Sequence, residues 1–190
     1  MPTKSYLIPV GDLSLEARVA FRASVDDDLL KTAERVAIRD MEADLLVRDS
    51  LPNTDLGTAA AGGVALAAQE DWLMAAAGVV AAEGPLVWAT LAQDRCIGFY
   101  GLAINNAPAV VSRVRFQLGA GAVRAVYQIE QLEPRLEPIG YFSKPVFFTR
   151  NEPVRILVMP KIAFAVNTMR MPMLARTVEP IGAVVSAPSV

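Results

Sequence analysis

Hydrophobic and polar residues alternate over most of the second half of the chain. From about residue 85 to residue 185, apolar side chains recur at every second position in short runs, as in half-buried β-strands. Eight such runs are present: Leu86–Leu91, Cys96–Ile104, Val110–Leu118, Val123–Leu132, Ile139–Phe148, Val154–Met159, Ala163–Met169 and Ala175–Val185. Turn-forming Gly, Pro and Asn residues separate them. We therefore predict a mainly β protein, with a jelly-roll-like or Ig-like β-sandwich over about residues 95–186.

The third run predicts which side chains face the core. One of its faces carries Val110, Ser112, Val114, Phe116 and Leu118, and the other carries Val111, Arg113, Arg115 and Gln117. Because alternate side chains of a strand point to opposite faces, we expect Val114 and Phe116 in the core and the arginines outside. The next run predicts a second core face, made of Val123, Ala125, Tyr127 and Ile129.

Residues 1–94 are expected to form an N-terminal arm and a helical segment packed on the sandwich domain of residues 95–190. Alternation over residues 13–21 predicts an extended segment within this arm. Apolar residues then recur at steps of three and four from Leu29 to Met41, which predicts a helix. Three carboxylates precede that pattern and are placed to cap the helix and meet its positive end: Asp26, Asp27 and Asp28.

Three further segments lie before the strands. Residues 47–57 have the composition of a turn, and the alanine-rich residues 58–69 fit either a loose helix or an ordered loop. Residues 70–82 predict a better helix, which ends at Gly84 and Pro85. Its buried face would contain Trp72, Leu73, Ala76 and Val79 or Val80. Two or three helices are expected in total.

The composition supports a packed core. Hydrophobic residues make up 53% of the 190 residues and charged residues 20%, which excludes disorder for most of the chain. The single cysteine, Cys96, excludes an internal disulfide and fits a protein assembled in a reducing compartment. We expect no signal peptide and no membrane span, because the 17-residue uncharged run from Cys96 to Ser112 contains Asn105, Asn106 and Pro108.

The formal net charge of −2 hides an asymmetry between the two halves. Residues 1–95 carry 8 basic and 15 acidic groups, whereas residues 96–190 carry 10 basic and 5 acidic groups. This distribution favours head-to-tail contacts between subunits, or an acidic segment packed on a basic one within the chain; surface decoration without function explains it as well.

The chain offers little material for catalysis. It contains no histidine, so the commonest general base and metal ligand is absent. Cys96 lies in an apolar run and is interpreted as a buried thiol, and the three aspartates at 26–28 lack the further ligands a metal site needs. None of the four lysines, Lys4, Lys31, Lys144 and Lys161, follows a Ser-x-x-Lys pattern, and no phosphate-binding loop is present. We expect no enzyme activity, no catalytic, cofactor-binding or metal-binding residues, and no cofactor.

Two polar sets leave alternatives open. A pair of carboxylates for glycoside cleavage remains open from the sequence, but most of the acidic residues of the second half lie beside prolines and are expected at the rim: Glu130, Glu133, Glu137, Glu152 and Glu179. Arg113, Arg115 and Arg124 predict a basic stripe on one sheet face. Without aromatic partners on that face, specific nucleic-acid binding is not expected.

Four fragments taken in order resemble a known group of proteins. They are Ile97-Gly98-Phe99-Tyr100-Gly101, Ser112-Arg113-Val114-Arg115-Phe116, Glu137-Pro138-Ile139-Gly140-Tyr141-Phe142 and Glu179-Pro180-Ile181-Gly182. Over residues 95–186 this order resembles the β-sandwich structural proteins of bacteriophage virions, above all capsid auxiliary (cement or decoration) proteins and minor capsid subunits. The resemblance implies a non-enzymatic virion protein, assembled in the host cytoplasm, that binds copies of itself as a dimer or trimer and a major capsid or other shell protein.

Two alternatives stand beside this interpretation: the single-jelly-roll major capsid protein of a tailless phage, and a carbohydrate-binding sandwich. The latter needs aromatic rings exposed on one sheet face. Aromatic residues occur in adjacent pairs, so one ring of each pair must face outward: Phe99 and Tyr100, Tyr141 and Phe142, Phe147 and Phe148.

Overall fold

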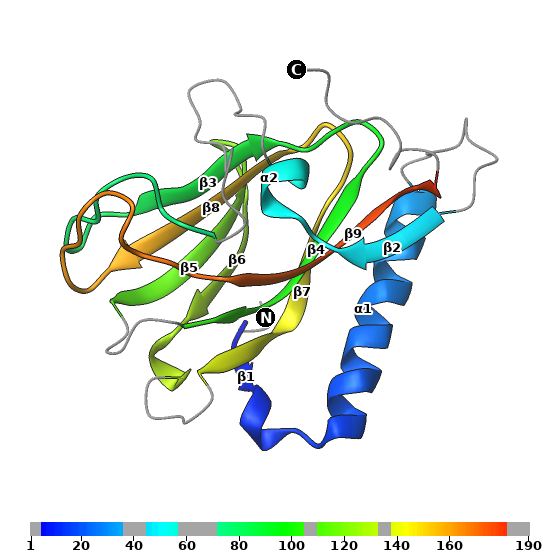
Figure 1. Ribbon diagram of the computed structural model, residues 1–190, viewed down its shortest axis with the longest axis horizontal. Helices are drawn as coiled ribbons and strands as arrows, with labels where there is room; N and C mark the ends of the chain where they lie inside the picture. The colour runs from blue at the N-terminus through cyan, green and yellow to red at the C-terminus, as the bar shows by residue number, and fades with distance from the viewer. Residues whose placement is uncertain (1–4, 36–44, 57–71, 105–109, 133–137, 182–190) are drawn as a thin grey trace.

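A computed structural model describes residues 5–35, 45–56, 72–104, 110–132 and 138–181. In these ranges the protein is mainly β, with two antiparallel sheets and one long helix (Figure 1). The elements in chain order are β1 (Leu7–Pro9), η1 (Val10–Asp12), α1 (Leu15–Arg35), β2 (Leu45–Asp49), α2 (Pro52–Asp55), β3 (Gly84–Thr90), β4 (Cys96–Ala103), β5 (Val111–Leu118), β6 (Val123–Gln128), η2 (Glu130–Leu132), β7 (Ile139–Phe148), β8 (Pro153–Pro160) and β9 (Met173–Pro180).

The strands are ordered β1-β7-β4-β9-β2 in the five-stranded sheet and β3-β8-β5-β6 in the four-stranded sheet. From β2 onward they pair in a nested way. β5 pairs with β6, β4 with β7, β3 with β8 and β2 with β9, each time antiparallel. Strands β2 to β5 are therefore paired, in reverse order, with strands β6 to β9, as in one long hairpin.

The two sheets pack face to face through aromatic rings. Phe99 of β4 lies 5.3 Å from Phe116 of β5, measured between ring centroids, and Phe116 lies 5.4 Å from Phe142 of β7. Tyr127 of β6 stacks on Phe142 at 4.1 Å. These four side chains are fully buried, so the core of the molecule lies between the sheets. The prediction that Val114 and Phe116 face the core is confirmed.

Helix α1 covers the outer face of the five-stranded sheet. Its Val25, Leu29 and Ala33 are buried, and the last two contact Cys96 of β4 and Val178 of β9. Figure 1 shows the helix along one side of the molecule, with β2 near its C-terminal end. Because this sheet is covered on both faces, seven of the eight residues of β4 are buried.

The structure begins this helix at Leu15, fourteen residues before the start of the predicted helical pattern at Leu29. The predicted extended segment over residues 13–21 is wrong, because Ser14 caps a helix there: its Oγ accepts a hydrogen bond from the Ala17 N–H. The aspartates at 26–28 accordingly lie in the middle of α1 and do not cap it. The prediction of two or three helices is also wrong for the described residues, in which α1 is the one long helix and α2 a single turn.

No helix forms over residues 72–82, the described part of the predicted helix 70–82. This segment runs antiparallel to residues 164–171 instead: the Met74 N–H donates to the Met169 carbonyl, and the Gly78 N–H to the Phe164 carbonyl, both at 2.9 Å. Trp72 is buried as predicted, but Val79 and Val80 are exposed. A pairing partner some 90 residues away in sequence outweighed the local helical pattern.

Three predicted segments need smaller corrections. Residues 47–57 contain the end of β2 and helix α2 as well as turns, and the predicted strand Ala163–Met169 forms only an isolated bridge at Phe164. The predicted strand Ala175–Val185 corresponds to β9, which is described as far as Pro180. The alanine-rich residues 58–69 lie outside the described residues. The strands β1, β2 and β3, all before residue 95, belong to the two sheets.

A register shift in β5 corrects one face assignment. The alternation places Val111 on the face of Arg113, yet Val111 is 2% exposed and belongs to the core together with Val114. The pairing with β8 is irregular between Val111 and Arg113, so the extra residue reverses the alternation at that point.

Candidate functional site

The outer faces of the two sheets differ in what covers them. On the five-stranded sheet, one ring of each aromatic pair does face outward, as predicted: Tyr100, Tyr141 and Phe147. The chain's own helix covers them, since Phe21 of α1 stacks on Tyr141 with ring centroids 4.9 Å apart and Phe147 packs beside Leu29. These rings are therefore not available as a platform for a sugar.

The outer face of the four-stranded sheet carries arginines. Trp88 of β3, Arg155 of β8 and Gln117 of β5 are register partners in one row across three strands. Arg113 and Arg115 follow on β5. We call these five residues, with Glu83 just before β3, the arginine face. In the described ranges no long helix lies on this side of the molecule (Figure 1).

Two contacts organise the arginine face. Glu83 accepts hydrogen bonds from Arg113 Nη2 and Nε, at 2.8 and 3.1 Å, and forms an ion pair with Arg115. The Arg155 guanidinium lies 4.3 Å from the centroid of the Trp88 ring, a cation–π contact. The Trp88 ring is therefore covered by an arginine, and a single carboxylate is shared by two others.

Four polar atoms of this face are buried and have no hydrogen-bond partner among the described residues. They are Trp88 Nε1, Arg115 Nε, Gln117 Oε1 and Arg155 Nε. Three of the four are donors. A buried polar atom without a partner costs about 1–3 kcal/mol, so these atoms are an unfavourable feature of the face. With three arginines to one glutamate, the face suits an anionic, oxygen-rich partner surface.

A second polar cluster is buried and consists of two carboxylates paired with two arginines. Asp55 of α2 and Glu179 of β9 have side chains exposed by 0% and 2%, and both pair with Arg48 of β2, at 2.8 and 2.6 Å. Arg95 contacts the same two carboxylates, at 3.2 and 3.0 Å. The hydrogen bond from Arg48 lowers the pKa of Glu179, and the pKa of Arg48 is raised in turn.

This cluster joins elements and leaves no group for catalysis. Thr177 Oγ1 donates to Asp55 Oδ2 at 2.9 Å, so the carboxylate is held from three directions. Both acids are buried and paired with Arg48 and Arg95, so neither is free to act as a general base. Glu179 was expected at the rim, and this expectation is wrong.

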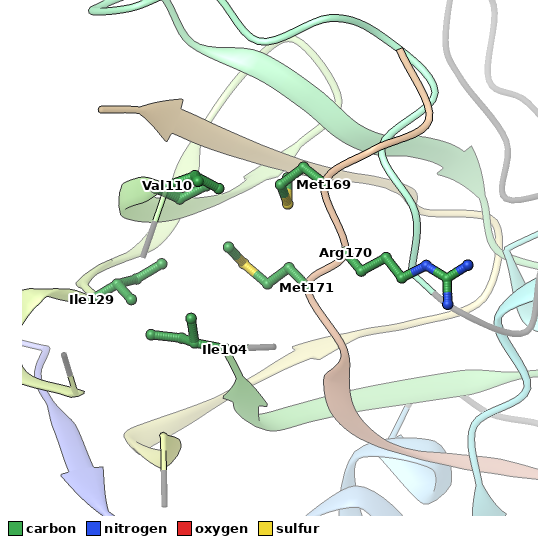
Figure 2. A pocket seen from close by; sticks show the side chains of 7 residues that line it. Ile104, Val110, Ile129, Met169, Arg170 and Met171 are labelled. Atoms are coloured by element: carbon green, nitrogen blue, oxygen red, sulfur yellow. The ribbon is translucent and has the colours of Figure 1, made fainter. Parts of the chain in front are cut away.

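The described pockets are poor ligand sites. Figure 2 shows the first, where Ile104, Ile129 and Met171 converge while the Arg170 side chain extends away from them. Its volume is about 10 Å³, roughly the room for one water, and its lining is almost wholly apolar. The second is an open hollow of about 330 Å³ that includes Tyr127, whose pKa burial raises to about 12. The first lacks the convergent polar groups of a small-molecule site, and the second has Ser5, Arg124, Tyr127 and Lys144 in its lining but is open to solvent.

The other acidic residues that the sequence offered as metal ligands or catalytic carboxylates lie in separate ion pairs. Asp26 pairs with Arg176 of β9, Asp27 with Lys31, Glu152 with Arg124 and Glu130 with Lys161. Glu133 and Glu137 lie outside the described residues. Within the described ranges no group of three His, Cys, Asp or Glu side chains could hold a metal ion. Burial raises the pKa of the Cys96 thiol to about 11, in agreement with its interpretation as a buried thiol.

Sequence reasoning found only part of the arginine face. The alternation in β5 predicted Arg113 and Arg115 outside, but Arg124 pairs with Glu152 and is not a register partner of them. Trp88, Arg155 and Glu83 were missed. The alternating pattern indicates that Trp88 and Arg155 face outward. That they lie side by side depends on the pairing of β3 with β8, which the sequence pattern does not give.

Comparison with known proteins adds no relative. No protein-family model, curated protein or solved structure matches this chain. In the described ranges no helix is long and apolar enough to span a membrane, and α1 itself carries charged residues along its whole length.

Proposed function

We propose that this protein is a structural subunit of a virus particle, either a capsid cement or decoration protein or a minor capsid subunit, that binds copies of itself and a shell protein. The resemblance of residues 97–101, 112–116, 137–142 and 179–182 to phage virion proteins motivates the proposal. The absence of histidine from the sequence and the pairing of the buried carboxylates support a role in binding rather than in catalysis.

The nested strand pairing is the observation that carries this proposal. A jelly roll is a double sheet of eight strands built from two Greek keys, and it occurs in viral capsid proteins as well as lectins and cupins. The pairs β2–β9, β3–β8, β4–β7 and β5–β6 fit an eight-stranded hairpin rolled into two sheets. An Ig-like sandwich orders its strands differently, with strands A, B, E and D in one sheet and C, F and G in the other. The topology thus favours the jelly-roll alternative.

The arginine face is the proposed attachment surface for the shell protein. Its three arginines, which outnumber its one glutamate, favour carboxylate oxygens on the partner. Repeated contacts around a shell would raise the effective concentration of each weak contact, so modest affinity at each subunit suffices.

The charge asymmetry between the halves is used partly within the chain. Arg176 of the basic half pairs with Asp26 and Asp49 of the acidic half, and Arg113 and Arg115 pair with Glu83. This is the packing of acidic on basic segments that the sequence predicted as one alternative. Head-to-tail contact between subunits remains part of the proposal.

The major capsid protein is the second candidate, because the eight-strand order by itself suits a single-jelly-roll shell subunit. Electron microscopy of the purified chain separates the two. A major capsid subunit should assemble into closed shells without another protein, whereas an auxiliary subunit should stay a small oligomer in light scattering. The mass of this protein in each virus particle gives its copy number, which also distinguishes a major capsid subunit from an auxiliary one.

A binding experiment tests attachment through the arginine face. The double variant Arg113→Gln/Arg115→Gln keeps side-chain length but removes two charges, and it should bind shell particles at least tenfold more weakly than the parent chain. Arg150→Gln, in the exposed turn after β7, is the matched control and should bind like the parent. Equal binding by a folded double variant would overturn the attachment surface. A strict monomer that binds no shell particle would overturn the proposed function.

A further inference from the structure

In the part of the chain that the structure describes, one face of the first half of α1 carries exposed apolar side chains. Leu15 is 76% exposed and Val19 61% exposed, and Ala23 one turn later is also exposed. These three residues are four positions apart, so they form one apolar row along the helix. The buried residues of α1, in contrast, lie in its second half, at Val25, Leu29 and Ala33.

We propose that this row is the contact between two copies of the chain, in which the first halves of two α1 helices pair antiparallel around a two-fold axis at Val19. The inference deepens the proposed function and rests on it for the expectation that copies meet. The occupant of the row is thus a second copy of this chain, bound through the same residues.

The sequence of the helix is self-complementary about Val19. In an antiparallel two-fold pair, a residue n positions before Val19 lies level with the residue n positions after Val19 on the partner. Leu15 is then level with Ala23, so the largest exposed apolar side chain meets a small one. Each copy contributes one Leu15 and one Ala23, so the Leu15–Ala23 contact occurs twice in the dimer.

The charges beside the row follow the same rule. Glu16 precedes Val19 by three positions and Arg22 follows it by three, so each glutamate is level with an arginine of the partner. Arg22 Nη2 already donates to Asp49 Oδ1 at 2.8 Å, and a guanidinium has further donors for a second carboxylate. A parallel pair would instead place like charges level with each other, which is unfavourable.

Position 19 can be tested by cross-linking. With helix axes about 8–10 Å apart and Cα atoms about 2.3 Å from each axis, two Cα atoms at the symmetry axis come within disulfide range. Val19→Cys should therefore form a covalent dimer rapidly under mild oxidation. Cys96 is fully buried and supplies no competing thiol. Ser24→Cys, exposed on another side of the same helix, is the control and should cross-link at least tenfold more slowly.

A charge-reversal series tests the antiparallel register. Glu16→Arg and Arg22→Glu should each weaken the dimer about 2- to 30-fold in sedimentation, because each removes two symmetric exposed pairs. The double variant Glu16→Arg/Arg22→Glu restores opposite charges at both levels and should return to within about threefold of the parent. Glu34→Arg, exposed but far from the axis, should change nothing. Recovery in the double variant cannot arise from a folding defect of the single variants.

The results separate this inference from the proposed function. Equal cross-linking at positions 19 and 24, or no recovery in the double variant, would overturn the helix pairing, whether or not the chain still binds shell particles. A dimer with the expected pattern in a chain that binds no particle would support the pairing and overturn the proposed function.

Discussion

Arg176 on β9 holds Asp26 on α1 through two hydrogen bonds, from Nε at 2.7 Å and from Nη2 at 3.0 Å. The two residues are 150 positions apart in sequence, and Arg176 is only 8% exposed. A third nitrogen, Nη1, donates to Asp49 of β2 at 2.8 Å. The Arg176 side chain thus attaches both helix α1 and the edge strand β2 to the five-stranded sheet.

Removing this contact should weaken the attachment of α1. Arg176→Met retains the apolar stem but leaves Asp26 without its donors, and it should lower the free energy of unfolding by about 1.5–3 kcal/mol in urea denaturation. Lys31→Met, which breaks an exposed pair on the same helix, should cost no more than about 0.5 kcal/mol. Equal effects of the two substitutions would contradict the role given to Arg176.

The register of β5 gives a second prediction. Phe116 is fully buried and contacts three other rings, so Phe116→Ala should cost about 3–5 kcal/mol of unfolding free energy. The Arg113 side chain is 36% exposed, and Arg113→Ala should cost less than about 1 kcal/mol. The reverse order of the two values would mean that every face assignment in this strand is inverted.

Acid should destabilise the corner formed by β2, α2 and β9. The Arg48 hydrogen bond lowers the pKa of Glu179 below its ordinary value of 4.5, so this carboxylate stabilises the folded state above that pH. The contribution is lost as the pH falls through 4.5 toward the folded-state pKa, because the unfolded chain then binds the proton more readily. Thermal melting from pH 7 to pH 3 measures this. Glu179→Gln should show a weaker pH dependence over that interval and a lower melting temperature at pH 7.

The thiol of Cys96 should be unreactive in the native protein. It is fully buried, and burial raises its pKa to about 11, so almost no thiolate exists at pH 8. A disulfide reagent such as DTNB should label it only after unfolding, at a rate set by the unfolding equilibrium. Rapid stoichiometric labelling at pH 8 in the absence of denaturant would contradict this burial.

The strands were predictable from sequence because their signal is local. Seven of the eight predicted runs correspond to strands, since alternation reports directly that one face of a strand is buried. The start of α1 was missed because the alternation of residues 13–21 outweighed the cap signal of Ser14 followed by Glu16. The local pattern of residues 72–78 predicts a helix because it carries no sign of their pairing partner, residues 164–171, which lies far away in sequence.

The candidate site was predictable only in part for the same reason. Arg113 and Arg115 lie two residues apart on one strand, so the alternation alone places them together. Trp88 meets Arg155 across β3 and β8, and Glu83 reaches β5 from the start of β3. These contacts depend on which strands become neighbours, which the composition of the single strands does not specify.

The nested pairing of the strands also implies an order of folding. The β5–β6 hairpin closes a turn of only a few residues, with the Gly121 N–H donating to the Leu118 carbonyl. Once it has formed, β4 and β7 are separated by a short effective loop, so pairing them costs little loop-closure entropy. The same holds for each later pair. The last closure joins β2 to β9, where residue 45 lies opposite residue 180. The buried ion pairs of Arg48 therefore stabilise the pair that forms last, and their loss should open the molecule from that edge inward.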